Sequence, residues 1–135
     1  MKLVLASLFF CFVTQSFLSF SEVLVSAKAD NKKVLLVFSG SDWCHGCISF
    51  KKNVTGTAEF ARYAKTDIVY YLADFPRDRK TITEEQLTEN QRLAELYNKK
   101  GMFPHVVLFA ADGAVLRQRS GAFKTFEELK TWVEE

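Results

Sequence analysis

The stretch VLLVFSGSDWCHGC, residues 34–47, contains the pattern that decides the fold. Residues 34–38 form an uninterrupted apolar run, which is typical of a strand buried on both faces of a sheet. A polar turn at residues 39–42 follows and leads to Cys44 and Cys47, which are about one helical turn apart. We therefore expect a central strand, a short loop and a helix that begins near Cys44.

The position of the two cysteines predicts a redox-active pair. Backbone N–H groups point outward at a helix N-terminus, and the helix dipole there favours the thiolate form of Cys44. A thiolate with a second thiol one turn away can attack a disulfide and then be released by its neighbour. A structural disulfide usually closes a longer loop, because its stabilising effect grows with loop length. We therefore predict a thiol–disulfide oxidoreductase with Cys44 and Cys47 as catalytic residues and no cofactor.

The length and composition indicate one globular domain. The chain has 135 residues, of which 48% are hydrophobic and 13 are phenylalanines, so it can bury a substantial core. The formal net charge of +2 gives no support to nucleic-acid binding. The charged run at residues 77–80 is interpreted as a solvated loop.

The N-terminus has the pattern of an export signal. Lys2 precedes an apolar run at residues 3–13, which is too short to span a bilayer comfortably. We expect a signal peptide at residues 1–16, with cleavage as late as residue 21 as a second option, followed by a single domain at residues 17–135. An uncleaved anchor at residues 3–20 remains the alternative. Export places the cysteine pair in a bacterial periplasm or an equivalent lumen, where disulfides persist.

The third cysteine, Cys11, lies inside the apolar run of the signal and is expected to be removed with it. The bulky phenylalanines before it make a poor lipidation motif.

The rest of the chain alternates helical and strand patterns. Together with the strand at 34–38, these predict an α/β fold with a central mixed β-sheet of about four strands and helices on both faces. The expected helices lie at about 20–29, 44–53, 57–65, 83–99 and 125–133, and the further strands at 68–73, 105–109 and 114–118, with a loop at 76–80 and a hairpin turn at 111–113.

This order of elements, with Trp-Cys-x-x-Cys after the first strand and a proline before the third, resembles the thioredoxin superfamily. The resemblance covers about residues 20–135. Several stretches are more similar to the exported thioredoxin-like proteins of bacteria, including DsbH-type reductases. These stretches are residues 38–44, 74–76, 90–97, 103–104 and 112–113.

The resemblance implies roles for five residues. Cys44 would be the exposed nucleophile and Cys47 the buried resolving thiol. Phe103 and Pro104 would form a cis-proline loop that faces the sulfurs, where a substrate could pair with the backbone as an extra strand. Trp43 would form one wall of the site or, as an alternative, belong purely to the core.

Three positions depart from the family pattern. Val37 occupies the place of a buried acid that helps to move the proton of the second cysteine in thioredoxin. The dipeptide between the cysteines is His45-Gly46, and His105 follows the proline where threonine is usual. A protonated His45 would favour the thiolate and make the protein more oxidising, whereas a ring that points to solvent would have no such effect.

The resemblance also implies partners: disulfide-containing protein substrates and a membrane protein that supplies electrons, with the chain itself a monomer. It favours a periplasmic protein disulfide reductase. An oxidase or isomerase of the same fold remains open, as does a non-catalytic binding module.

Two other functions of a Cys-x-x-Cys pair, zinc binding and haem attachment, need further residues that this sequence lacks. A zinc site would need a second pair of ligands, and haem attachment would need a histidine where Ile48 stands. We therefore expect no metal.

Overall fold

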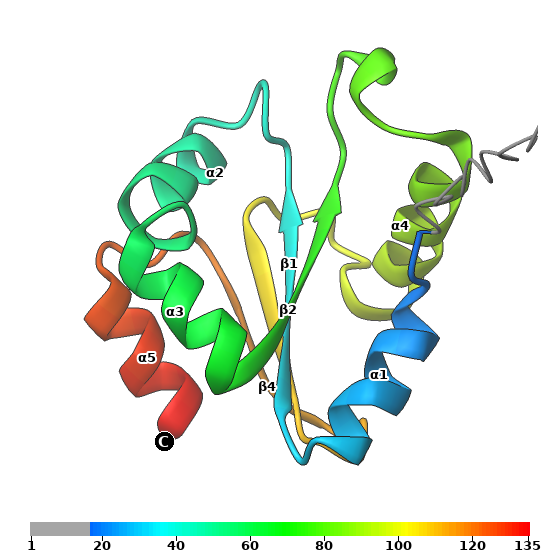
Figure 1. Ribbon diagram of the computed structural model, residues 1–135. Helices are drawn as coiled ribbons and strands as arrows, with labels where there is room; N and C mark the ends of the chain where they lie inside the picture. Colours follow the sequence, from blue (N-terminus) through cyan, green and yellow to red (C-terminus); the bar gives the residue numbers. More distant parts are fainter. Residues whose placement is uncertain (1–16) are drawn as a thin grey trace, which may run out of the picture.

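The computed structural model describes residues 17–135, and its centre is a four-stranded sheet (Figure 1). The strand order is β2-β1-β3-β4. β1 and β2 are parallel, whereas β3 is antiparallel to both β1 and β4, so the sheet is mixed. The strands are β1 (Lys33–Ser39), β2 (Ile68–Asp74), β3 (His105–Phe109) and β4 (Val115–Ser120).

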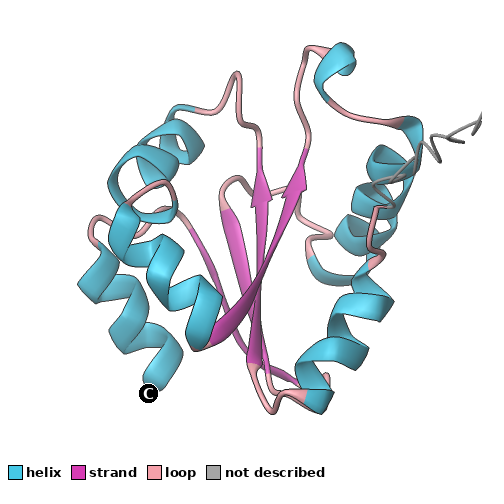
Figure 2. Cartoon of the chain, in the orientation of Figure 1, coloured by secondary structure: helices cyan, strands magenta, loops and turns pink. Residues whose placement is uncertain are grey.

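Helices cover both faces of this sheet (Figure 2). α1 and α4 pack on one face, and α2, α3 and α5 pack on the other (Figure 1). The helices are α1 (Phe20–Ala29), α2 (His45–Phe50), α3 (Ala58–Thr66), α4 (Glu84–Tyr97) and α5 (Phe126–Glu134), with a π-helical turn η1 (Lys51–Thr55) and a 3-10 turn η2 (Arg79–Thr81). This arrangement confirms the predicted fold class.

Side chains of successive strand residues point to opposite faces, so each buried strand contributes to two cores. In β1, Leu35 and Val37 face α2, α3 and α5, whereas the alternate residues face α1 and α4. The first core is completed by Phe50, Phe60, Phe123 and Leu129, among others. The second contains Phe20, Leu93 and Phe109. The uninterrupted apolar run therefore belongs to a strand covered on both faces, as predicted.

The helix expected at residues 44–53 differs in detail. α2 passes into the π-helical turn η1, where the Gly56 N–H donates to the Lys51 carbonyl five residues earlier, at 2.7 Å. A Cβ atom at position 56 would lie 2.6 Å from that carbonyl oxygen, so glycine permits the wider turn. The turn keeps Cys47, Phe50 and Val54 on the buried face.

The predicted signal peptide at residues 1–16 lies outside the described residues. Within residues 17–135, no helix combines the length and the apolar character needed to cross a membrane.

Candidate active site

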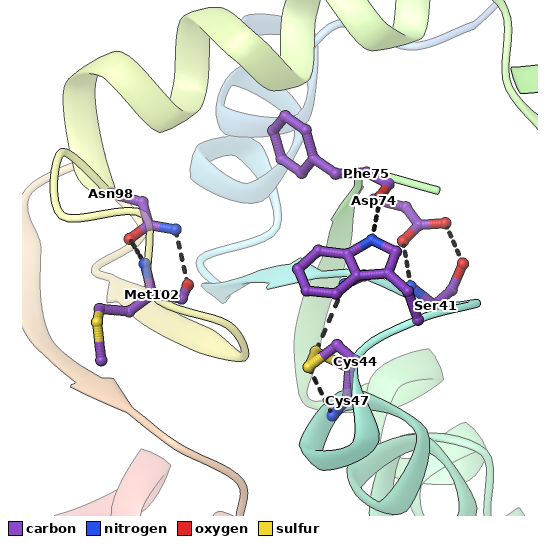
Figure 3. Close-up of a disulfide and its surroundings, with 9 residues drawn as sticks. Ser41, Cys44, Cys47, Asp74, Phe75, Asn98 and Met102 are labelled. Atoms are coloured by element: carbon purple, nitrogen blue, oxygen red, sulfur yellow. Dashed lines mark hydrogen bonds between the residues drawn. A yellow bond between two sulfur atoms is a disulfide. The ribbon is translucent and has the colours of Figure 1, made fainter. Parts of the chain in front are cut away.

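Cys44 and Cys47 form a disulfide at the start of α2, at the end of the sheet where β1 and β2 finish (Figure 3). Cys44 is the N-cap residue of α2, and its sulfur accepts the Cys47 N–H at 3.2 Å. The Gly40 N–H points to the Cys47 sulfur at 3.4 Å. Both sulfurs therefore face backbone N–H groups, which favour negative charge on sulfur.

The two cysteines are both buried, with exposed fractions of 8% for Cys44 and 3% for Cys47. The expectation of an exposed Cys44 is therefore wrong for this oxidised form, although Cys44 is the more accessible of the two. The cause is local packing. The Cys44 sulfur is bonded to Cys47. Pro104 packs against Gly46, between the two cysteines, so closely that a Cβ at Gly46 would lie 3.2 Å from the Cδ of Pro104.

Trp43 is partly buried and is fixed on several sides. Its indole N–H donates to the Phe75 carbonyl at 2.7 Å, and its ring meets Phe103 edge-on at 5.4 Å between centroids. The Arg77 guanidinium lies over the ring, 5.7 Å from the centroid. A Cβ at Gly40 would lie within 2.6 Å of three ring atoms, so only glycine leaves space for the indole. Trp43 therefore forms a rigid wall beside the disulfide.

The loop from β1 to α2 is held by Asp74 at the end of β2 (Figure 3). The Asp74 carboxylate accepts the Ser41 N–H at 3.0 Å and the Ser41 hydroxyl at 2.5 Å. Asn90, buried in α4, donates from its side chain to the Asp74 carbonyl at 2.9 Å. These three residues were not singled out from the sequence as site residues, because nothing local indicates that residues 41, 74 and 90 meet.

Asp42 holds the segment that follows β2. Its two carboxylate oxygens accept the backbone N–H groups of Arg77 and Asp78, both at 2.9 Å. These bonds, first that of Asp78 and then that of Arg77, hold the pKa of Asp42 below its usual value. The side chain of Asp42 is exposed. Asp42 thus joins two loops that are more than 30 residues apart.

Phe103 and Pro104 lie beside Trp43 and the disulfide, and the peptide bond between them is cis. Phe103 packs edge-on between Trp43 and Phe75. The preceding loop is held by buried Asn98, whose side chain donates to the Met102 carbonyl at 2.9 Å and accepts the Met102 N–H at 3.0 Å (Figure 3). The fold therefore brings Trp43, Phe103 and Pro104 together around the cysteines.

The two histidines have different surroundings. His45 is the first residue of α2 and is exposed, and the hydrogen bonds of residues 17–135 include none from its ring. His105 is buried, and its ring nitrogens pair with the Ser120 hydroxyl at 2.8 Å and the Gln118 side-chain oxygen at 3.2 Å. His105 therefore links β3 to β4.

Val37 is 2% exposed and lies within the apolar core on the α2 face, so no carboxyl group occupies that position. Within residues 17–135, no cluster of three or more histidine, cysteine or acidic side chains could hold a metal ion.

A cysteine pair at a helix start, opposite a cis-proline loop and beside a mixed sheet, defines a protein of the thioredoxin class. Residues 20–135 match the family model described as a thioredoxin-like domain, and the chain therefore belongs to the thioredoxin-like family.

The comparisons with individual proteins are consistent with this family. The chain is 36% identical over 98 residues to the disulfide bond reductase DsbH of Chlamydia pneumoniae. That match covers 73% of this chain but only 58% of the relative. A solved structure of a DsbH oxidoreductase is 30% identical, with a TM-score of 0.71, and the match covers 88% of this chain and 84% of that one.

More distant structures share the fold alone. An exposed lipoprotein thioredoxin from Streptococcus pneumoniae is 21% identical, with a TM-score of 0.59 over 82% of this chain and 88% of that one.

Proposed function

We propose that this chain is an exported thiol–disulfide oxidoreductase that reduces disulfides in other proteins. The observation that carries the proposal is the Cys44–Cys47 disulfide at the start of α2, with both sulfurs facing backbone N–H groups. A pair that closes only a four-residue loop adds little to stability, so a redox role accounts for it better than a structural one. The similarity to a disulfide bond reductase supports the reductive direction.

In the proposed reaction the reduced protein transfers two electrons to its substrate. The Cys44 thiolate attacks one sulfur of a substrate disulfide, and a mixed disulfide forms while the other substrate sulfur leaves as a thiolate. Cys47 then loses its proton and attacks the Cys44 sulfur, which releases the second substrate thiolate. The products are a substrate dithiol and the Cys44–Cys47 disulfide.

Because Val37 supplies no carboxyl group near Cys47, the proton of that thiol passes to water or to the departing substrate thiolate. The Gly40 N–H, 3.4 Å from the Cys47 sulfur, stabilises the charge that develops there.

The substrate docks on Trp43, Phe103 and Pro104, which border the disulfide. Trp43 and Phe103 pack edge-on and provide an aromatic surface whose position does not depend on the substrate. His45 is exposed on the same rim.

The signal pattern at residues 1–16 supports export to the periplasm. A reductase in an oxidising compartment has to be reduced again after each cycle, and a membrane protein that relays electrons would supply this step.

The proposal is tested by trapping the intermediate. Cys47→Ala should accumulate a mixed disulfide with a disulfide-containing protein such as insulin, because no thiol remains to resolve it. The matched variant Cys44→Ala should trap nothing. If Cys44→Ala trapped as much substrate as Cys47→Ala, the assignment of the two roles would be wrong.

The direction is tested by the reduction potential of the pair in glutathione or dithiothreitol buffers. We expect a value near about −270 mV, as in thioredoxin. A value near about −120 mV, as in the oxidant DsbA, would make the protein an oxidase. If Cys44→Ser left the biological function intact, the protein would be a binding module instead.

A further inference from the structure

The segment that connects β2 to α4 rises at the same end of the sheet as the loop that leads into α2 (Figure 1). We call residues 75–80 of this segment the basic loop. Five contacts hold it against the end of β1 and the loop that leads into α2. The Phe75 N–H donates to the Ser39 carbonyl at 2.8 Å, and the Phe75 carbonyl accepts the indole N–H of Trp43. Arg77 lies over the indole, and Asp42 accepts the backbone N–H groups of residues 77 and 78. The basic loop is therefore a fixed extension of the surface around the disulfide.

Two acidic side chains in this region, those of Asp42 and Asp78, accept hydrogen bonds from backbone N–H groups. Asp42 accepts the N–H groups of residues 77 and 78. Asp78 is the N-cap of η2 and accepts the Lys80 N–H at 3.0 Å. Glu84 and Glu85 lie in the first turn of α4, where the helix dipole favours negative charge. The carboxylates thus stabilise the loop and the helix start.

The cationic side chains of the loop form no ion pair within the described residues, although Arg77 is near enough to the Asp42 carboxylate to help lower its pKa. Arg77, Arg79 and Lys80 are exposed, and none of them takes part in the three ion pairs found among residues 17–135. Arg77 lies directly over Trp43, so this positive charge begins at the wall of the site itself. Within the described residues, Arg77 therefore places a positive charge at the wall of the site, and Arg79 and Lys80 add two further exposed cations along the same loop.

We propose that the basic loop is a second docking surface, which selects substrate proteins with acidic residues close to the reactive disulfide. This inference rests on the proposed function and adds the class of substrate. Charges at the rim of an interface act mainly on the rate of association, so the selection affects encounter more than the chemical step.

The test uses two synthetic peptides with the same intramolecular disulfide, flanked in one by aspartates and in the other by lysines. The reduced protein, freed of dithiothreitol, is mixed with each peptide, and the second-order rate of reduction is measured. At about 0.01 M salt, where the screening length is about 30 Å, the acidic peptide should react roughly tenfold faster than the basic one. At about 1 M salt, where that length is about 3 Å, the preference should disappear.

A charge reversal locates the effect. The double variant Arg79→Glu with Lys80→Glu should lose or invert the preference, since both side chains are exposed and form no hydrogen bond or ion pair within residues 17–135. The matched control is Lys28→Glu with Lys65→Glu. These residues also lie in the last turns of helices and give the same change in net charge, but at the opposite end of the sheet.

The control variant should keep the preference of the native protein, and circular dichroism checks that both variants are folded. The reduction potential should be equal in all three proteins, because the loop acts on association. Equal rates for the two peptides, or a preference that survives in the Arg79/Lys80 variant, would overturn the inference. If the native protein reduced neither peptide while dithiothreitol reduced both, the proposed function itself would fail.

Discussion

The two cores of the sheet and the end of the sheet that carries the disulfide are stabilised by different interactions. The cores are apolar, and Leu35, Phe109 and Leu129 are 0% exposed. The disulfide end depends on polar bonds between loops, such as those of Asp42 and Asp74. Apolar packing in the cores therefore gives most of the stability, whereas the hydrogen bonds between loops set the geometry of the site.

The largest effect is expected from a substitution in the core. Phe109→Ala removes a ring that packs edge-on against Phe20 and Tyr97 at 5.3 and 5.1 Å. We expect a loss of about 3–5 kcal/mol in the free energy of unfolding, measured by urea denaturation. In the fraction that stays folded, the reaction of the cysteines with a peptide disulfide should be unchanged. A large change in that rate would show that the two regions are not separate.

The second prediction concerns the disulfide end. Asp74→Ala removes both bonds to Ser41 and should cost about 1–3 kcal/mol of stability. Here the rate of thiol–disulfide exchange should fall as well, because the loop before Cys44 loses its anchor. Asp74→Asn keeps one acceptor oxygen and serves as the control, with a smaller effect on both measurements. An unchanged rate in Asp74→Ala would mean that Asp74 acts on stability alone.

A smaller effect is expected at Tyr71, which lies on the core face. Its hydroxyl is buried and has no hydrogen-bond partner among the described residues, and burial raises its pKa to about 12. Tyr71→Phe should therefore change the free energy of unfolding by less than about 1 kcal/mol, in the stabilising direction. A clear loss of stability in thermal denaturation would show that the hydroxyl has a bonded partner in solution.

The smallest effect concerns the exposed Asp42. Its pKa is lower in the folded chain than in the unfolded one, because the carboxylate accepts two backbone N–H groups. Its contribution to stability is therefore complete above the unfolded pKa and is lost as the pH falls through the folded pKa. Between pH 5 and pH 3, Asp42→Asn should lose less stability than the native protein. Equal losses in the two urea titrations would contradict this.

The same comparison explains what could be predicted from the sequence. The core was predictable because an apolar pattern is a local signal: the apolar run at residues 34–38 indicated a strand covered on both faces. The cysteine pair was predictable from its spacing and context. The bonds from Asp42 to residues 77 and 78 and from Asp74 to Ser41 were not, since they join residues more than 30 positions apart and depend on the tertiary fold.

The close approach of Gly40 to the ring of Trp43 has a consequence for the divergence of this sequence. Any larger residue at position 40 would need a different side chain at position 43, because the two occupy the same space. The two positions should therefore change together or not at all. Residue 45 should tolerate substitution more readily, because its side chain is exposed.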